Sequence, residues 1–183
     1  MAKIMKRVFG ITLLMTICSC ILYQLMAEKL FLIFAITFGT TAYHFGVRLL
    51  IGTLFNCIMK NKLDYTRRWY RVNDLEMKLY KKMNVKKWKN KMPTYDKDTF
   101  DISKHSWNEI IQATCQSELV HEANVVLSFL PLVSSVWFGE FTVFFITSML
   151  SAIFDLMFVF MQRFNRARIL KMKEIKPNDK EIL

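Results

Sequence analysis

Four apolar stretches divide the chain, and each approaches or exceeds the length of a helix that crosses a membrane. They lie at about residues 8–26, 30–50, 118–138 and 141–161, and a bilayer core needs about 20 mostly apolar residues per helix. Hydrophobic residues make up 53% of the 183 residues, which is too apolar for an ordinary soluble domain of this length. The pattern predicts an all-α fold, an integral membrane bundle of four transmembrane helices.

These stretches come in two pairs with very short links. Only residues 27–29 separate the first two stretches, and only residues 139–140 separate the last two, so each pair is expected to form a helical hairpin. The second apolar run extends past Arg48, and we expect it to leave the hydrocarbon near residue 50 and to continue as an interfacial helix. No long linker is visible, so residues 1–183 are expected to form a single membrane domain.

Lysine and arginine are concentrated away from the hairpin tips. Residues 60–104 hold 14 of them and residues 163–180 hold seven, whereas the two tips together offer only Lys29. On the positive-inside rule, both termini and a segment of about residues 60–117 are expected in the cytoplasm, as in a multi-pass protein of a cell membrane. The net charge of +11 is then a signal of topology and of anionic lipid, rather than of nucleic-acid binding.

The cytoplasmic segment is expected to contain a basic amphipathic helix. From Asp64 onward, apolar residues recur at helical spacing with basic residues largely around the other side, as far as a stop at Pro93. The apolar positions are Trp69, Val72, Leu75, Leu79 and Met83. Such a helix is typical of the headgroup layer, where aromatic rings dip into the acyl boundary and Lys and Arg meet anionic lipid headgroups. The alternative is a solvated charged helix that packs on its own domain.

Ionisable residues at membrane depth gather toward the cytoplasmic side. Glu118, His121 and Glu122 share one face of the third helix at its cytoplasmic start. Groups from the other helices approach the same leaflet: His44, Arg48, Asp155, Arg163, Arg166 and Arg168. Because charges in hydrocarbon are costly, they are expected to face a polar interior and to pair with one another. Together they favour a site, and the alternative is a set of buried ion pairs, such as Arg48 with Asp155, that fix helix packing without chemistry.

A histidine one turn from a carboxylate is the arrangement of a general base. Glu118 is expected to hold His121 in one tautomer while the imidazole takes a proton from a hydroxyl, and Asp155 is a third candidate catalytic residue. Arginines at the rim suit a phosphate-bearing donor or a developing oxyanion. Glu118-x-x-His121 also resembles half of a di-iron motif, but the chain has no second copy, so neither a metal nor another cofactor is expected.

Three motifs, "VKKWKNKMP", "ELVH" and "QRFNRAR", occur in the order and roughly the spacing of a known family. Over about residues 80–170 the chain resembles the small bacterial integral-membrane glycosyl-diaponeurosporenoate acyltransferases, which add a fatty acyl group to the sugar of a staphyloxanthin-type carotenoid. The family's signature residues fall on Lys87, Trp88, Lys89, Lys91, Glu118, His121, Gln162, Arg163, Phe164, Asn165, Arg166 and Arg168. The chain departs from the family pattern in having Ala167 in place of proline, Phe164 in place of the common tyrosine, and Glu122 as an added acid.

This resemblance implies transfer of a fatty acyl group onto a hydroxyl of a membrane glycolipid at the cytoplasmic leaflet, a glycosylated carotenoid being one such acceptor. Arg163, Arg166 and Arg168 would hold the phosphates of an acyl-CoA or acyl-carrier donor, and Gln162 and Asn165 would hydrogen-bond the acceptor or the tetrahedral intermediate. The remaining candidate substrate-binding residues are His44, Arg48 and Trp88. Two alternatives stay open: a small membrane methyltransferase of the isoprenylcysteine or phospholipid type, which takes S-adenosylmethionine, and a non-enzymatic membrane scaffold.

Overall fold

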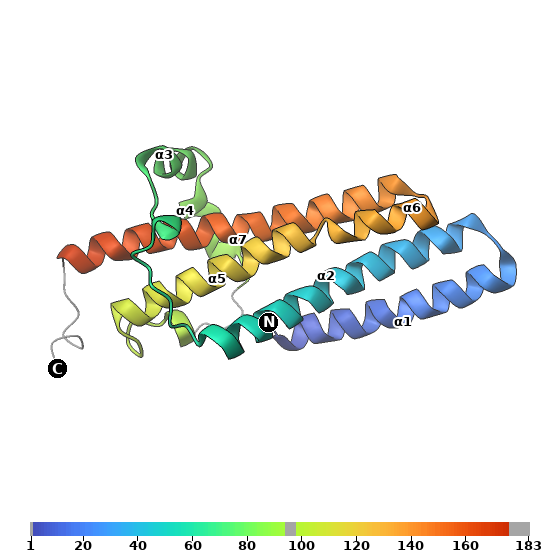
Figure 1. Cartoon of the computed structure of the whole chain (residues 1–183), viewed down its shortest axis with the longest axis horizontal. Coiled ribbons are helices and arrows are strands. Elements are labelled where there is room, and N and C mark those ends of the chain that lie inside the picture. The colour runs from blue at the N-terminus through green and yellow to red at the C-terminus, as the bar shows by residue number, and fades with distance from the viewer. Residues whose placement is uncertain (1, 94–97, 176–183) are drawn as a thin grey trace. The chain divides into compact units, whose positions relative to one another are not determined.

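The computed structural model describes residues 2–93 and 98–175, and these residues fold into helices and connecting turns without a strand (Figure 1). The α-helices are α1 (Ala2–Met26), α2 (Lys29–Met59), α3 (Asp74–Lys82), α4 (Val85–Trp88), α5 (Trp107–Leu127), α6 (Ser135–Phe138) and α7 (Phe141–Ile175). Shorter 3-10 turns lie at Arg68–Tyr70, Lys89–Lys91, Asp98–Phe100 and Leu130–Ser134. The predicted all-α fold is confirmed.

Two compact units make up the chain. The hairpin unit comprises residues 2–53 and 122–155, and the described part of the polar unit comprises residues 54–93, 98–121 and 156–175. Helices α2, α5 and α7 each contribute residues to both units. The single membrane domain expected from the sequence stays a prediction.

Both helical hairpins are present in the hairpin unit. Ala27 and Glu28 link α1 to α2, and Gly139 and Glu140 link α6 to α7. Each turn uses the left-handed backbone region, with φ of 54° at Ala27, 69° at Gly139 and 50° at Glu140, a common way for a helix to end. The Nζ of Lys29 lies 2.7 Å from Oε1 of Glu140, so the two hairpin tips touch, as expected if they lie on the same side of a membrane.

Among the described residues, four segments are long and apolar enough to cross a membrane by length and composition: Lys3–Met26, Lys29–Met59, Trp107–Phe138 and Phe141–Ile175. The third of these segments contains the predicted span at 118–138, and within it α5 ends at Leu127 and a 3-10 turn precedes α6. Pro131 lies in that turn. A proline inside an α-helix removes one backbone hydrogen bond and its ring clashes with the carbonyl four residues earlier, here that of Leu127.

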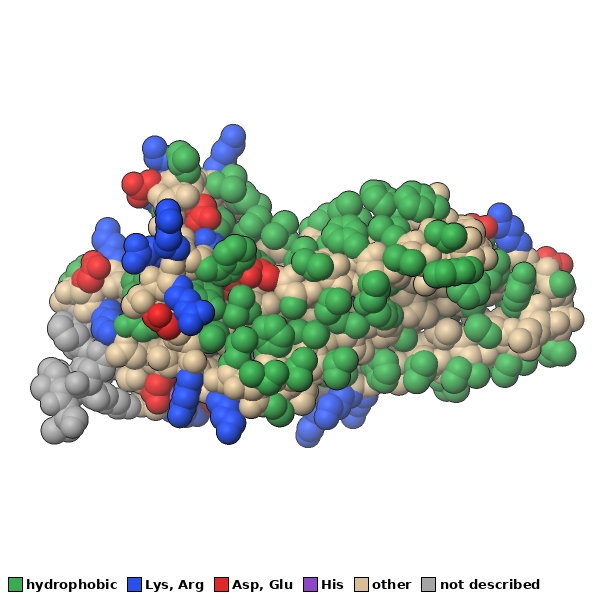
Figure 2. Space-filling model, viewed as in Figure 1, with side chains coloured by type: hydrophobic (Ala, Val, Ile, Leu, Met, Phe, Trp, Pro, Cys, Tyr) green, Lys and Arg blue, Asp and Glu red, His purple; other side chains and the backbone are tan. Residues whose placement is uncertain are grey.

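The hairpin unit exposes a wide apolar surface. Its most exposed large side chains include Leu25, Val136 and Trp137, with 77%, 80% and 73% of their surface exposed. Figure 2 shows apolar side chains over much of this unit, whereas lysines and arginines gather around α3 in the polar unit. A continuous apolar surface is unfavourable in water and is the surface expected of helices that face lipid.

The predicted amphipathic helix from Asp64 is broken in the structure. Residues 68–70 form a 3-10 turn, and α3 begins only after Asn73, whose Oδ1 accepts a hydrogen bond from the Glu76 backbone N–H at 2.7 Å. At the other end, Asn84 adopts a left-handed φ of 53° and turns the chain into α4. The helix is therefore one short capped segment, because the cap and the turn override the amphipathic spacing.

A small apolar core holds α3 and α4 against α7 in the polar unit. Tyr80, Val85 and Phe164 are buried at its centre. Val72, Met77, Trp88 and Phe160 pack around them. This core fixes the basic segment on α7, so the segment is not a loose tether.

Candidate functional site

A buried carboxylate lies at the centre of the polar unit. The side chain of Glu118 on α5 has no exposed surface, and its Oε1 accepts a hydrogen bond from Nη1 of Arg163 at 2.6 Å. Its Oε2 forms an ion pair with Nη1 of Arg166, which is also fully buried. The two arginines are three residues apart on α7 and so share one face of that helix. A buried charge of this kind is stable only because its partners neutralise it.

The same two arginines hold the turn that precedes α3. Arg163 donates to the backbone carbonyls of Trp69 and Arg71, at 3.0 and 3.1 Å, while Arg166 donates twice to the carbonyl of Tyr70, at 3.1 and 2.9 Å. Nη2 of Arg163 also lies 3.1 Å from both carboxylate oxygens of Glu76 on α3. Two arginines and two glutamates thus form a neutral cluster that ties α3, α5 and α7 together.

This geometry bears on two sequence-based expectations. Both carboxylate oxygens of Glu118 contact arginines, and the predicted orientation of His121 by Glu118 stays a prediction. Arg166 has no exposed surface and the side chain of Arg163 is only 12% exposed, so neither guanidinium is available to grip a donor phosphate in this arrangement. Phosphate binding by Arg163 and Arg166 stays a prediction.

Glu76 and the carbonyls of residues 69–71 belong to the cluster but were missed at the level of sequence. The Asn73-x-x-Glu76 spacing is a helix-start signal that would have placed the beginning of α3 correctly. Nothing in the sequence pairs Glu76 with Arg163, because the two residues meet only when α3 folds onto α7.

His121 lies one turn beyond Glu118 on α5 and is half-buried. Its imidazole stacks on the ring of Phe158, with ring centroids 4.4 Å apart and an angle of 7° between the planes. Stacking fixes the plane of the imidazole and leaves its two nitrogens at the edge of the stack. That is a suitable arrangement for a group that gives and takes protons in a partly buried setting.

The other predicted substrate-binding residues of the polar unit differ in how available they are. Gln162 is buried and donates to Oγ of Ser117 at 3.0 Å, and Oδ1 of Asn165 accepts from Nζ of Lys89 at 2.6 Å. Trp88 packs in the apolar core and donates to the carbonyl of Met83 at 3.1 Å, which is the behaviour of a structural residue. Arg168 is exposed, with its guanidinium 5.8 Å from the centroid of Phe164.

In the hairpin unit, Arg48 and Asp155 form a buried ion pair. Nη2 and Nε of Arg48 lie 2.6 and 3.0 Å from Oδ2 of Asp155, and Nη2 also donates to Oγ of Ser151 at 2.8 Å. Asp155 has no exposed surface. This is the ion pair of the packing alternative that the sequence left open, and the roles predicted for Asp155 in catalysis and for Arg48 in substrate binding stay predictions.

His44 is the remaining predicted residue, and it also lies in the hairpin unit. It is buried, with its ring edge-on to Tyr43 at a centroid distance of 5.4 Å. The Nε2 atom has no hydrogen-bond partner among the described residues. Within residues 2–93 and 98–175, no group of three or more His, Cys, Asp or Glu side chains is arranged to hold a metal ion.

Comparison with known proteins gives one match. The CrtO family model, glycosyl-4,4'-diaponeurosporenoate acyltransferase, matches residues 66–175, which include the charge cluster, His121 and its stacking partner. No curated protein and no solved structure matches the chain. Because the family model covers more than half of the sequence, the chain belongs to the glycosyl-4,4'-diaponeurosporenoate acyltransferase family.

Proposed function

We propose that this protein moves a fatty acyl group from an activated donor onto a hydroxyl of a membrane glycolipid at the cytoplasmic leaflet. The family match over residues 66–175 carries the proposal, because it coincides with the segments that hold the partly buried histidine beside the charge cluster. A glycosylated carotenoid is proposed as the acceptor on the basis of the family's description. The donor is proposed to be an acyl-CoA or an acyl-carrier thioester.

His121 is proposed as the general base. Its imidazole, held flat against Phe158, takes the proton of the acceptor hydroxyl as the hydroxyl oxygen attacks the thioester carbonyl carbon. The tetrahedral intermediate then expels the thiolate, which takes the proton from the imidazolium, so an ester and a free thiol are formed. Asn165 follows Phe158 by two helical turns on the same face of α7 and is proposed to hydrogen-bond the acceptor.

Glu118, Arg163 and Arg166 are proposed as positioning residues. They join the helix that carries His121 to the helix that carries Phe158, through the 2.6 Å hydrogen bond from Arg163 to Glu118 and the ion pair of Arg166 with Glu118. Catalysis depends on the placement of reacting groups to within a fraction of an ångström. The cluster therefore supports the chemistry by fixing α5 against α7 instead of by touching the substrate.

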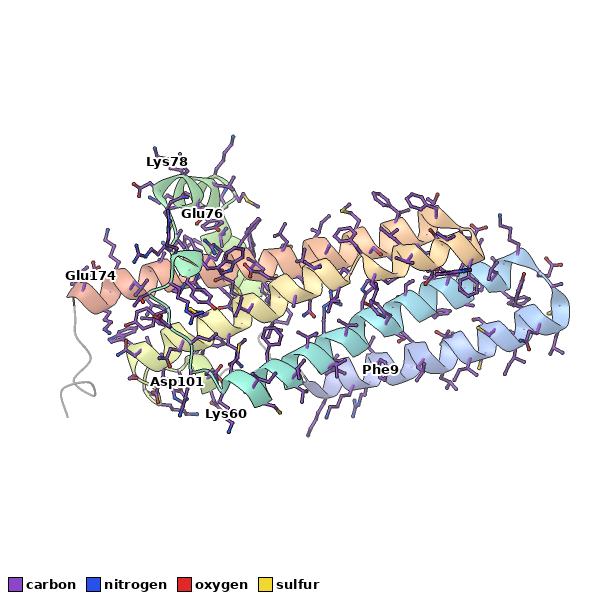
Figure 3. All side chains as sticks on the ribbon, viewed as in Figure 1. Phe9, Lys60, Glu76, Lys78, Asp101 and Glu174 are labelled. Atoms are coloured by element: carbon purple, nitrogen blue, oxygen red, sulfur yellow. The ribbon has the colours of Figure 1, made fainter. Side chains whose placement is uncertain are left out.

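The exposed face of α3 supports an interfacial position for the polar unit. Leu75 and Leu79 are 75% and 47% exposed, and Lys78 and Lys82 lie beside them. Figure 3 shows Lys78 on the opposite side of α3 from Glu76, the residue that faces α7. An apolar stripe bordered by lysines suits a membrane surface rich in anionic lipid, so α3 is proposed to rest on the cytoplasmic leaflet.

Labelled donors test the proposal directly. Membranes that contain the protein are incubated with radiolabelled acyl-CoA or acyl-carrier protein, and in parallel with labelled S-adenosylmethionine, and the lipids are then separated. Labelled lipid from an acyl donor, absent from membranes without the protein, is the expected result. Label from S-adenosylmethionine alone would instead identify a methyltransferase, and no labelled lipid from any of the three donors would leave the scaffold alternative.

A further inference from the structure

A pocket of about 430 Å³ lies in the polar unit, bounded by residues of α3, α4 and α7. Its floor is aromatic, with Tyr80 and Phe164 only 2% and 5% exposed. Four exposed cations stand at its walls: Lys81, Lys86, Arg168 and Lys171. We call this cavity the basic pocket. Its volume falls in the range of about 300 to 1,000 Å³ that is common for small-molecule sites.

The basic pocket carries an uncompensated positive charge. No acidic side chain lines it, and none of its four cations forms an ion pair with a carboxylate in the described part of the chain. Burial, together with the nearby Arg168 and Lys86, lowers the pKa of the Lys89 ammonium below its ordinary value. Like charges held this close together are unfavourable unless an anion is shared between them.

Two cations are already held over the aromatic floor. The guanidinium of Arg168 lies 5.8 Å and Nζ of Lys89 lies 5.6 Å from the centroid of Phe164. Because Phe164 belongs to the buried apolar core, this floor is rigid, and the charges around it are partly pre-positioned. Arginine and lysine in such a setting are the side chains that recognise phosphate groups.

We propose that the basic pocket binds the phosphate groups of the acyl donor and that the donor's pantetheine arm runs from there toward His121. This inference rests on the proposed function for the identity of the thioester. It assigns phosphate recognition to Arg168 and three lysines, in place of Arg163 and Arg166, which both pair with Glu118.

The route from the pocket to the histidine follows α7. Phe164 comes six residues after Phe158, a rise of about 9 Å, and Phe158 is the stacking partner of His121. Lys89 lies at the pocket end of this interval, where it is placed over Phe164 and donates to Asn165, which shares a helix face with Phe158. A pantetheine arm separates the phosphates of the donor from its thioester by several bonds. If the phosphates are bound in the pocket and the arm runs along α7, the thioester carbonyl lies toward the imidazole of His121.

Direct binding measurements test the inference without relying on turnover. Coenzyme A is titrated into the purified full-length protein in nanodiscs of neutral lipid, with carrier protein bearing phosphopantetheine as the second probe. Lys86→Gln and Arg168→Gln should each weaken binding of whichever probe binds by about tenfold or more, since each removes a charge-assisted contact. Lys87→Gln is the matched control: this exposed lysine adjoins Lys86 but does not line the pocket, and its loss should change binding less than threefold.

Three further probes distinguish the sources of phosphate. Pantetheine without phosphate should bind weakly and equally to parent and variants, and inorganic diphosphate should compete with coenzyme A. If anionic lipid in the nanodiscs abolishes the binding of both donor probes while Lys86→Gln restores it, the pocket is a lipid-headgroup site and the donor assignment is wrong. Unaltered donor binding in both pocket variants, or no binding of either probe, would overturn the inference.

These results are separable from the fate of the proposed function. A parent protein that binds coenzyme A through the pocket but yields no labelled lipid would remove the acyl-transfer proposal and leave the phosphate site standing. If the protein transfers acyl groups but the pocket variants bind the donor as tightly as the parent, the phosphate site would be wrong and the acyl-transfer proposal would stand.

Discussion

Replacing Glu118 with glutamine should destabilise the polar unit more than any other conservative exchange in the cluster. Glutamine keeps the shape of the side chain but removes the charge that neutralises the fully buried Arg166. Removing one partner of a buried ion pair costs about 3–5 kcal/mol. At roughly 2–4 °C per kcal/mol for a chain of this size, the unfolding midpoint should fall by about 6–20 °C.

Tryptophan fluorescence during heating measures this loss, because Trp69, Trp88 and Trp107 all lie in the polar unit. The control is Glu174→Gln, an exposed carboxylate near the end of α7 (Figure 3), which should change stability by less than about 0.5 kcal/mol. A Glu118→Gln, Arg166→Met double variant should recover part of the loss, since no unpaired guanidinium then remains at the centre of the cluster.

The opposite pattern would refute this reasoning. If Glu118→Gln unfolds at the parental temperature and still loses most of its acyl transfer, the carboxylate takes part in the chemistry and the positioning role is wrong.

Three further predictions concern the membrane-facing parts of the chain. Topology reporters fused after residue 60 should read cytoplasmic and one at Glu140 should not; a periplasmic signal after residue 60 would reverse the proposed orientation. A Cβ at Gly46 would lie 2.9 Å from Cε2 of Phe9 (labelled in Figure 3). Gly46→Val should therefore lower the free energy of unfolding by about 1–3 kcal/mol, and adding Phe9→Ala should restore part of it. An unchanged unfolding midpoint in Gly46→Val would argue against this packing of α1 on α2. Leu79→Ser should weaken the binding of an α3 peptide to vesicles of anionic lipid without altering the salt dependence of that binding. If the parent and Leu79→Ser peptides bind equally, the apolar stripe takes no part in membrane binding.

The hairpins were predictable from the sequence because their physical cause is local. Apolar runs of spanning length joined by links as short as Gly139 and Glu140 leave the chain no alternative to antiparallel neighbours. The break in the third span and the start of α3 were missed, although Pro131 and the Asn73-x-x-Glu76 cap are visible in the sequence. In both places the hydrophobic pattern was given more weight than the backbone chemistry that overrides it.

The site was less predictable because arginine has two opposite uses. The sequence predicts that Arg163, Arg166 and Arg168 lie near the membrane surface, but only tertiary contacts separate the two that pair with Glu118 from the one that is exposed at the basic pocket. Likewise, the spacing that places Glu118 next to His121 is the same whether the carboxylate orients the imidazole or pairs with α7. Long-range pairing decides such cases, and a single sequence does not encode it in any local pattern.

The central claim is that His121 is the base of an acyl transfer, and the His121→Gln variant tests it most directly. Acyl transfer to lipid is measured per folded protein, with the unfolding midpoint recorded for the same preparation. The account predicts a loss of turnover of about 10²- to 10⁴-fold, with a loss of stability too small to account for the loss of turnover. A His121→Gln protein that transfers acyl groups at the parental rate would contradict it.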